Sequence, residues 1–152
     1  MNRSKAKGTA AETAVVRWAR VNGFPGADRQ PLRGNRDAGD IALAPGIILE
    51  VKSVATAASG QPGAKLLETW LAQTDVETAN AGAAHGLLVV KRSGTADPRK
   101  WWCYIRLGEW LRLTGAHLPL PDPSQPVCVS LASAAAVLRS AGYGTAPEGE
   151  VL

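Results

Sequence analysis

The chain has 152 residues, enough for one domain with a single hydrophobic core. Its formal net charge is +4 at pH 7, and the basic excess lies before residue 37, where eight Lys or Arg stand against two acids. This distribution favours a polyanionic partner, and the lack of a long apolar run argues against a membrane span. Cys103 and Cys128 lack metal-binding spacing and make a poor disulfide framework, so we expect a reducing, cytoplasmic compartment.

The first expected elements are a basic, mobile arm over residues 2–8 and a helix that begins at Thr9 and ends at Gly23. Glu12 has two interpretations within this helix. The sequence Thr9-Ala-Ala-Glu12 is typical of a capping box, in which the glutamate hydrogen-bonds to the backbone of the N-cap residue. A catalytic role is the alternative, and this segment alone does not separate the two.

Residues 27–33 are expected to form the first strand, and Pro31 places that strand at a sheet edge or a bulge. The loop that follows carries Arg33 and Arg36, whose guanidinium groups can approach a phosphate. Simple solvation is the alternative for each arginine. Asp37 either forms a turn or supports a neighbouring site as an additional carboxylate.

A hairpin of two strands, residues 40–44 and 47–52, is predicted around the turn at Pro45-Gly46. The second strand is apolar except for Glu50 and Lys52. Alternation of side chains along a strand places these two on the same face. Charged groups on an inner strand usually need a partner, a metal or a reaction, so this strand is the centre of the predicted site.

The register of the hairpin decides whether Asp40 joins Glu50. A two-residue turn would place Asp40 opposite Val51, so we expect an odd-numbered loop or a bulge. Facing carboxylates with Cβ atoms about 5 Å apart repel each other unless a cation lies between them. Oxygen ligands alone favour Mg²⁺, with Mn²⁺ as a substitute, over zinc.

The middle of the chain predicts a helix followed by two strands. A flexible loop at residues 54–63 is expected before a helix over 64–80. Gln73 lies on one face of that helix with Glu77 and is most simply a surface residue. The continuous apolar run at 86–91 predicts a buried central strand, with residues 101–105 as its neighbour.

The last third of the chain is expected to be mostly helical or irregular. A short helix is predicted over residues 107–113, and the proline-rich stretch at 117–126 is too rich in proline for regular structure. A final alanine-rich helix over 131–141 would cover the sheet or pack against a second subunit, and residues 144–152 are expected to be disordered. His85 and His117 have no acid or nucleophile at a recognisable spacing and receive no role.

The Gly-Asp step at residues 39–40, followed ten residues later by Glu-x-Lys, resembles the PD-(D/E)xK nuclease superfamily, with Gly39 where many members have proline. Glu12 and the run from Arg29 to Lys52 look like the Holliday junction resolvase branch of that superfamily. The stretches Gly-Thr-Ala-Ala-Glu-Thr-Ala-Val-Val-Arg-Trp and Trp-Leu-x-x-x-x-Val-Glu-x-Ala-Asn are similar to resolvase-like proteins of actinobacterial phages. The likeness covers residues 5–105.

The resemblance implies an α/β fold: a restriction-endonuclease-like αβββαβ core over residues 9–115, with a mixed central sheet flanked by helices. A small extension over residues 116–143 would add the proline-rich linker and the last helix. Asp40, Glu50 and the carbonyl of Val51 would hold Mg²⁺, and Lys52 would act on the attacking water or the phosphate.

The resemblance also implies roles for residues outside that triplet. It places Glu12 near the metal, Arg29 near the scissile phosphate, and Gln73 near the metal from the following helix. Arg33, Arg36 and Gln73 are the other expected DNA-binding residues.

The implied function is a metal-dependent DNA endonuclease, a Holliday junction resolvase that acts as a homodimer in a bacterial or phage-infected cell. Two alternatives stay open. One is a nuclease that acts on ordinary duplex or flap DNA, as in repair or restriction. The other is a non-catalytic nucleic-acid-binding domain in which Glu50 and Lys52 form a surface ion pair.

Overall fold

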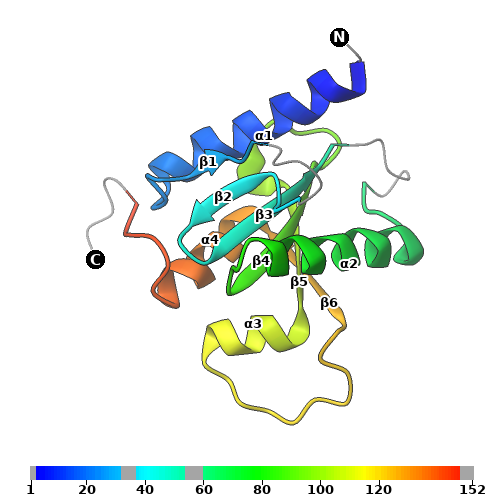
Figure 1. Ribbon diagram of the computed structural model, residues 1–152, viewed down its shortest axis with the longest axis vertical. Coiled ribbons are helices and arrows are strands. Elements are labelled where there is room, and N and C mark those ends of the chain that lie inside the picture. The colour runs from blue at the N-terminus through cyan, green and yellow to red at the C-terminus, as the bar shows by residue number, and fades with distance from the viewer. Residues whose placement is uncertain (1–2, 32–36, 54–59, 148–152) are drawn as a thin grey trace.

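The structure is a computed structural model that describes residues 3–31, 37–53 and 60–147. The described residues form one six-stranded mixed sheet with helices on both faces (Figure 1). The elements, in chain order, are α1 (Arg3–Val21), β1 (Asp28–Arg29), β2 (Ile41–Ala44), β3 (Ile47–Lys52), α2 (Ala64–Asn80), β4 (His85–Val90), the 3₁₀ helix η1 (Pro98–Lys100), β5 (Trp102–Arg106), α3 (Leu107–Thr114), β6 (Pro126–Ser130) and α4 (Leu131–Ser140). The predicted α/β class and the αβββαβ order are both confirmed.

The six strands lie side by side in the order in which they occur in the chain. β3 and β4 are parallel and are connected through α2, whereas every other neighbouring pair is antiparallel. A parallel pair needs a crossover connection, which the helix supplies. β3 and β4 are central strands whose side chains are mostly buried, as their apolar sequences predict.

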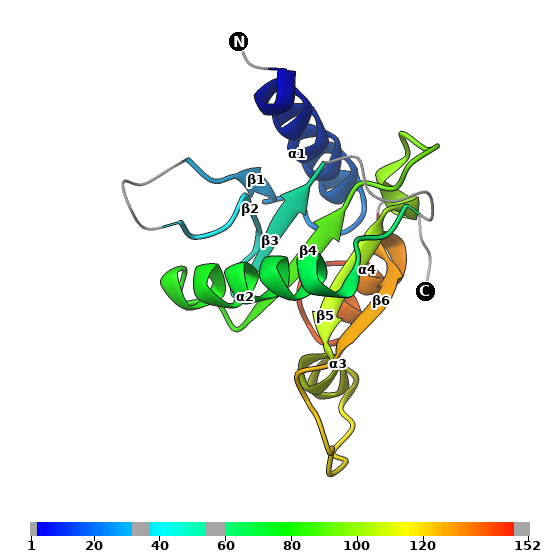
Figure 2. The same cartoon turned by 90° about the vertical axis from the view of Figure 1, so that its right-hand side faces the viewer.

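Alternate residues of the sheet pack into two separate apolar cores. Leu87 and Val89 of β4 belong to the larger core, which α1 and α4 cover. Leu88 and Val90 belong to the smaller core beneath α2, and Figure 2 shows α2 and α4 on opposite sides of the sheet. Gly86 permits the close approach of α2, because a Cβ atom there would lie 1.8 Å from Oγ1 of Thr78.

Helix α1 begins at Arg3, so the prediction that the helix starts at Thr9 is wrong. Residues 3–8, expected as a mobile arm, are the first turns of the helix. Lysine and alanine favour helix, and a single glycine inside a helix costs only about 1 kcal/mol relative to alanine. Residues 1 and 2 lie outside the described residues.

The first strand is shorter than expected but has the predicted position. β1 contains only Asp28 and Arg29 and forms an edge of the sheet beside β2. Pro31 lies beyond the strand, which fits its inability to donate a ladder hydrogen bond. Arg33 and Arg36 lie outside the described residues, as do residues 54–59 of the expected loop before α2.

The C-terminal third adds a strand that the sequence analysis did not predict. β6 pairs antiparallel with β5 along its whole length. Helix α4 then buries Leu131, Ala134, Ala135 and Leu138 in the larger core, so it covers the sheet. The preceding proline-rich stretch is irregular, as predicted, until β6 begins at Pro126.

The chain remains ordered beyond the last predicted helix. The amide of Thr145 donates to the carbonyl of Gly23 at 2.7 Å, so the expectation of disorder from residue 144 is wrong for residues 144–147. Both cysteines are free, and Cys103 is buried as a small apolar side chain. Among the described helices, none is long and apolar enough to cross a membrane.

Candidate metal centre

Asp40 lies beside Glu50 because the β2–β3 hairpin is bulged. Ile41 pairs with Leu49, and the pairing shifts register closer to the turn. The predicted bulge is therefore confirmed. Oδ2 of Asp40 accepts a hydrogen bond from the amide of Val51 at 2.8 Å, which fixes this carboxylate against the strand that carries Glu50.

Gly39 allows the chain to enter the hairpin at this point. Its φ of +94° is a left-handed conformation that side-chain-bearing residues rarely adopt, and a Cβ atom there would lie 3.1 Å from Cδ1 of Ile48. Proline, whose φ is fixed near −65°, cannot take this conformation. Glycine at position 39 thus has a local structural reason.

Glu50 and Lys52 project from β3 towards α2. Glu50 is only 4% exposed, and its Oε1 lies 3.4 Å from Nζ of Lys52. Lys52 also donates to Oε1 of Gln73 at 3.0 Å, and its Nζ lies 5.9 Å from the centroid of the Trp70 ring. Lys52 is therefore held on three sides at the end of β3.

Gln73 connects this lysine to a second buried acid. Its Nε2 donates to Oε1 of Glu77, one turn further along α2, at 2.8 Å. The structure therefore brings Gln73 to the predicted centre, where it contacts two charged side chains.

Glu77 is the residue of this centre that the sequence analysis gave no role. It is 1% exposed and lies on the buried stripe of α2 with Leu67, Trp70 and Thr74. A carboxylate among the apolar positions of an amphipathic helix is a signal that the sequence offers. Its meaning depends on β3, because only the packing of α2 shows that Glu77 meets Glu50.

The two buried glutamates share an unusual electrostatic environment. Burial raises the pKa of Glu50 well above the usual carboxyl range, and a hydrogen bond that protonated Glu50 donates to Glu77 raises it further. Burial also raises the pKa of Glu77. With both groups ionised, the Oε2 atom of each is buried without a hydrogen-bond partner in the described part of the chain, an arrangement that requires a proton or a cation.

Asp37 completes a group of three carboxylates. One oxygen each from Asp37, Glu50 and Glu77 lie within 4.8 Å of one another. Asp37 also accepts a hydrogen bond from the amide of Gly39 at 3.0 Å, and its carbonyl accepts one from Asn80 of α2 at 2.9 Å. The turn-forming interpretation of Asp37 is confirmed, and the same turn brings its carboxylate to the two glutamates.

Glu12 approaches the centre from α1. Its Oε2 lies 2.8 Å from Nε of Arg29, and because the helix begins at Arg3, Thr9 is not its N-cap residue. The capping-box interpretation is therefore wrong. Burial, followed by the charge of Asp40, raises the pKa of Glu12, whereas Arg29 lowers it.

A cavity of about 370 Å³ brings these groups to a common opening. Glu12, Arg29, Asp37 and Asp40 contribute to its lining. A larger hollow of about 570 Å³ lies around the β2–β3 turn and is lined by no ionisable side chain. The charged cavity beside Asp40 is therefore the better candidate for a site that handles phosphate and metal.

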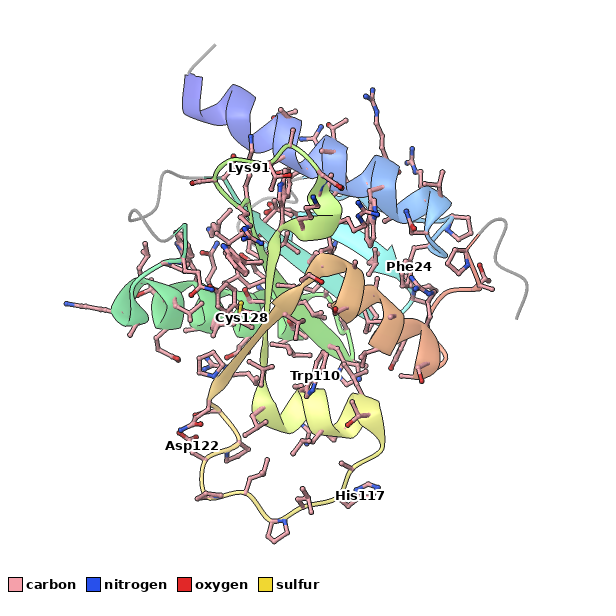
Figure 3. All side chains as sticks on the ribbon, turned by 180° about the vertical axis from the view of Figure 1, so that it is seen from behind. Phe24, Lys91, Trp110, His117, Asp122 and Cys128 are labelled. Carbon is pink, nitrogen blue, oxygen red and sulfur yellow. The ribbon has the colours of Figure 1, made fainter. Side chains whose placement is uncertain are left out.

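The remaining ionisable candidates lie elsewhere. His85 contacts Glu109 of α3 at 2.5 Å, at the end of β4 away from Lys52. Figure 3 shows His117 and Asp122 on the loop after α3, at the opposite end of the molecule from Lys91. Neither histidine joins the carboxylate group.

Comparisons with protein-family models, with curated proteins and with solved structures found no match to this chain. The residues themselves must therefore indicate the chemistry. Buried carboxylate oxygens, two of which have no hydrogen-bond partner in the part of the chain that the structure describes, are suited to a hard divalent cation such as Mg²⁺ or Mn²⁺. The group contains no thiolate or imidazole that would favour zinc.

Proposed function

We propose that the chain is a metal-dependent DNA endonuclease that hydrolyses phosphodiester bonds. The observation that carries the proposal is the placement of Asp40 beside buried Glu50, with Lys52 next to it on β3. Placing buried Glu50 and partly buried Asp40 close to one lysine is costly for a purely structural ion pair. The same three groups are those that a phosphodiesterase needs.

Asp40, Glu50 and the backbone carbonyl of Val51 are the groups proposed to hold Mg²⁺, for which Mn²⁺ can substitute. When bound, such a cation polarises the phosphoryl group and lowers the pKa of a bound water. The amide of Val51 already fixes one oxygen of Asp40, so that carboxylate is oriented before any ligand arrives.

Lys52 is proposed to stabilise the charge that develops on the phosphate or to orient the attacking water. Its hydrogen bond to Gln73 and its contact with Trp70 limit where its ammonium group can lie. Across the charged cavity, the guanidinium of Arg29 is proposed to contact the scissile phosphate. Oε2 of Glu12 lies 2.8 Å from Nε of Arg29 and holds the guanidinium in place.

Exposed basic residues next to the centre support a DNA substrate. Lys91, Arg92, Arg99 and Lys100 lie in the connection from β4 to β5 and are exposed. That connection starts beside the proposed centre, because the amide of Lys91 donates to the carbonyl of Lys52 at 2.9 Å. Phosphate contacts of this kind supply affinity that does not depend on sequence.

The proposed substrate is a four-way DNA junction, cut by a homodimer in the cytoplasm of a bacterial or phage-infected cell. This part of the proposal is based on the resemblance, and on the two-fold symmetry by which a dimer presents two equal sites. Ordinary duplex or flap DNA is the second candidate substrate, because the carboxylates and Lys52 suit any DNA phosphodiester. A non-catalytic DNA-binding domain is less consistent with the burial of Glu50.

A cleavage panel tests the proposal. End-labelled four-way junctions, flaps, nicked duplexes and linear duplexes are incubated with the full chain in Mg²⁺, with EDTA controls. Cutting of the junction alone supports a resolvase, and cutting of every substrate supports a general nuclease. Binding of all four without any cutting would leave only the DNA-binding domain.

A further inference from the structure

Glu77 is a buried acid that the proposed cation site of Asp40, Glu50 and Val51 does not use. It extends from α2 towards Glu50 of β3, and Gln73 occupies only its Oε1 atom. Among the described residues, its Oε2 atom and the Oε2 atom of Glu50 are buried without a donor. Two ionised carboxylates in this position repel each other, so the pair can be ionised only when a cation lies between them.

The described positive groups nearby are already engaged. Lys52 faces Oε1 of Glu50 and donates to Gln73. The Oε2 atoms of Glu50 and Glu77 therefore receive no hydrogen bond from the described residues. Arg29 is held by Glu12. A cation that enters from solution can instead reach the group past Asp37, whose carboxylate is at the more exposed side of the three.

We propose that Asp37, Glu50 and Glu77 form a second divalent-cation position, which shares Glu50 with the Asp40 position. The inference deepens the proposed function and rests on it for the first cation position. Three oxygen ligands within 4.8 Å of one another suit Mg²⁺ or Mn²⁺. The amide of Gly39 donates to the carboxylate of Asp37 and the side chain of Asn80 donates to its backbone carbonyl, so two hydrogen bonds fix the most exposed ligand.

Two cations that share a carboxylate are a recurring arrangement in enzymes that cut phosphodiesters, where both the attacking and the leaving oxygen need charge stabilisation. Here the shared ligand would be Glu50, with Asp40 and Val51 on one side and Glu77 and Asp37 on the other. The inference thus gives α2 a direct part in the centre.

The test is a Mn²⁺ titration of the full chain, followed by the paramagnetic signal of the free ion. Wild type is compared with Glu77→Gln, Asp37→Asn and Asp40→Asn. Glu68→Gln is the matched control, because it removes an exposed acid from the same helix. Thermal melts without metal check that each variant is folded. If Glu77→Gln is unstable, Asp37→Asn tests the same position, because asparagine keeps the oxygen that accepts the hydrogen bond from the amide of Gly39.

We expect two Mn²⁺ per wild-type and Glu68→Gln chain. Glu77→Gln and Asp37→Asn should each weaken one position by about tenfold or more and leave the other, whereas Asp40→Asn should weaken the other position. One Mn²⁺ per wild-type chain, or a Glu77→Gln titration equal to wild type, would overturn the inference. DNA cleavage by wild type, measured in parallel, tests the nuclease proposal separately from the Mn²⁺ count.

Discussion

Glu50 is the residue whose environment is hardest to explain without a ligand. Its side chain is buried beside Glu77 and close to Asp40. Burial, the contact with Glu77 and the charge of Asp40 all raise the pKa of Glu50, and burial has the largest effect. An unfolded chain leaves the same carboxyl near its ordinary pKa. Between these two values the folded protein binds more protons than the unfolded chain, so metal-free stability falls as pH rises.

Replacing Glu50 by Gln should therefore change the pH dependence of stability. Without metal, wild type should lose stability from about pH 5 to about pH 8, and Glu50→Gln should lose much less. At the higher pH the variant should be more stable by about 1–3 kcal/mol, the usual penalty of a buried unpartnered polar group. Denaturant unfolding at both pH values measures this, and an equally steep loss in the variant would contradict the assigned environment.

Lys52→Ala should lower turnover much more than DNA affinity. One lysine among many basic residues adds little to a multi-phosphate interface, whereas Lys52 is proposed as the ammonium group at the reacting phosphate. Single-turnover cleavage should slow by about 100-fold or more, with Kd nearly unchanged. Lys65→Ala, an exposed lysine of α2, is the control, and equal losses of rate and affinity would make Lys52 an ordinary phosphate contact.

At the scale of elements, the sequence predicted best where local pattern and tertiary position agree. The bulged hairpin followed from the need to bring Asp40 to Glu50, and the bulge is present. The predicted helix over residues 64–80 is α2, with the same bounds, and its buried residues recur at helical spacing. In the hairpin the alternation of side chains, and in α2 the helical spacing of apolar residues, indicates which face is covered.

The misses have equally local causes. β6 is half-exposed, begins at a proline and follows three others at positions 119, 121 and 123. The proline-rich composition before the strand therefore hides its short alternation of exposed and covered residues. The start of α1 was misplaced because Gly8-Thr9 looks like a cap, although the helix continues through it. Patterns in a single sequence leave Glu77 without a role, because its partner Glu50 comes from another element and such patterns carry no contact between elements.

The β4–β5 connection carries a prediction about DNA affinity. Arg92 is exposed and lies 4.4 Å from the centroid of the Trp102 ring, near the strand end that carries Lys52. Arg92→Gln should weaken binding to all DNA shapes and reduce the salt slope by about 0.9, the value for one lost phosphate contact.

The control for this prediction is Arg112→Gln. Arg112 is also exposed but lies on α3, where it pairs with Glu109. Its replacement changes net charge equally and should leave the slope unchanged. Equal slopes for the two variants would show that the β4–β5 connection is not a DNA contact.

For the whole molecule, the two faces of the sheet differ in what their helices contribute. α1 and α4 complete the larger apolar core, while α2 covers the opposite face and brings Gln73 and Glu77 to β3. Glu12 reaches the centre from the first face through the cavity that it shares with Asp40. The site therefore lies where elements from both faces of the sheet meet.

Assembly is the prediction that belongs to this scale. If the substrate is a four-way junction, the protein in solution should have the mass of two chains, measured by light scattering after size exclusion. It should also cut opposing strands at symmetry-related positions. A monomer that nicks strands independently would rule out the resolvase form and leave a general nuclease.

The most direct test of the cation-dependent nuclease is Asp40→Asn, compared with wild type on one end-labelled four-way junction under single-turnover conditions. Wild type should cut only when Mg²⁺ or Mn²⁺ is present. The variant should bind the junction as tightly or more tightly, because it loses a negative charge near the phosphate, and should cut about 100-fold more slowly or not at all. Cleavage by Asp40→Asn at the wild-type rate, or wild-type cleavage that persists in EDTA, would contradict the metal centre.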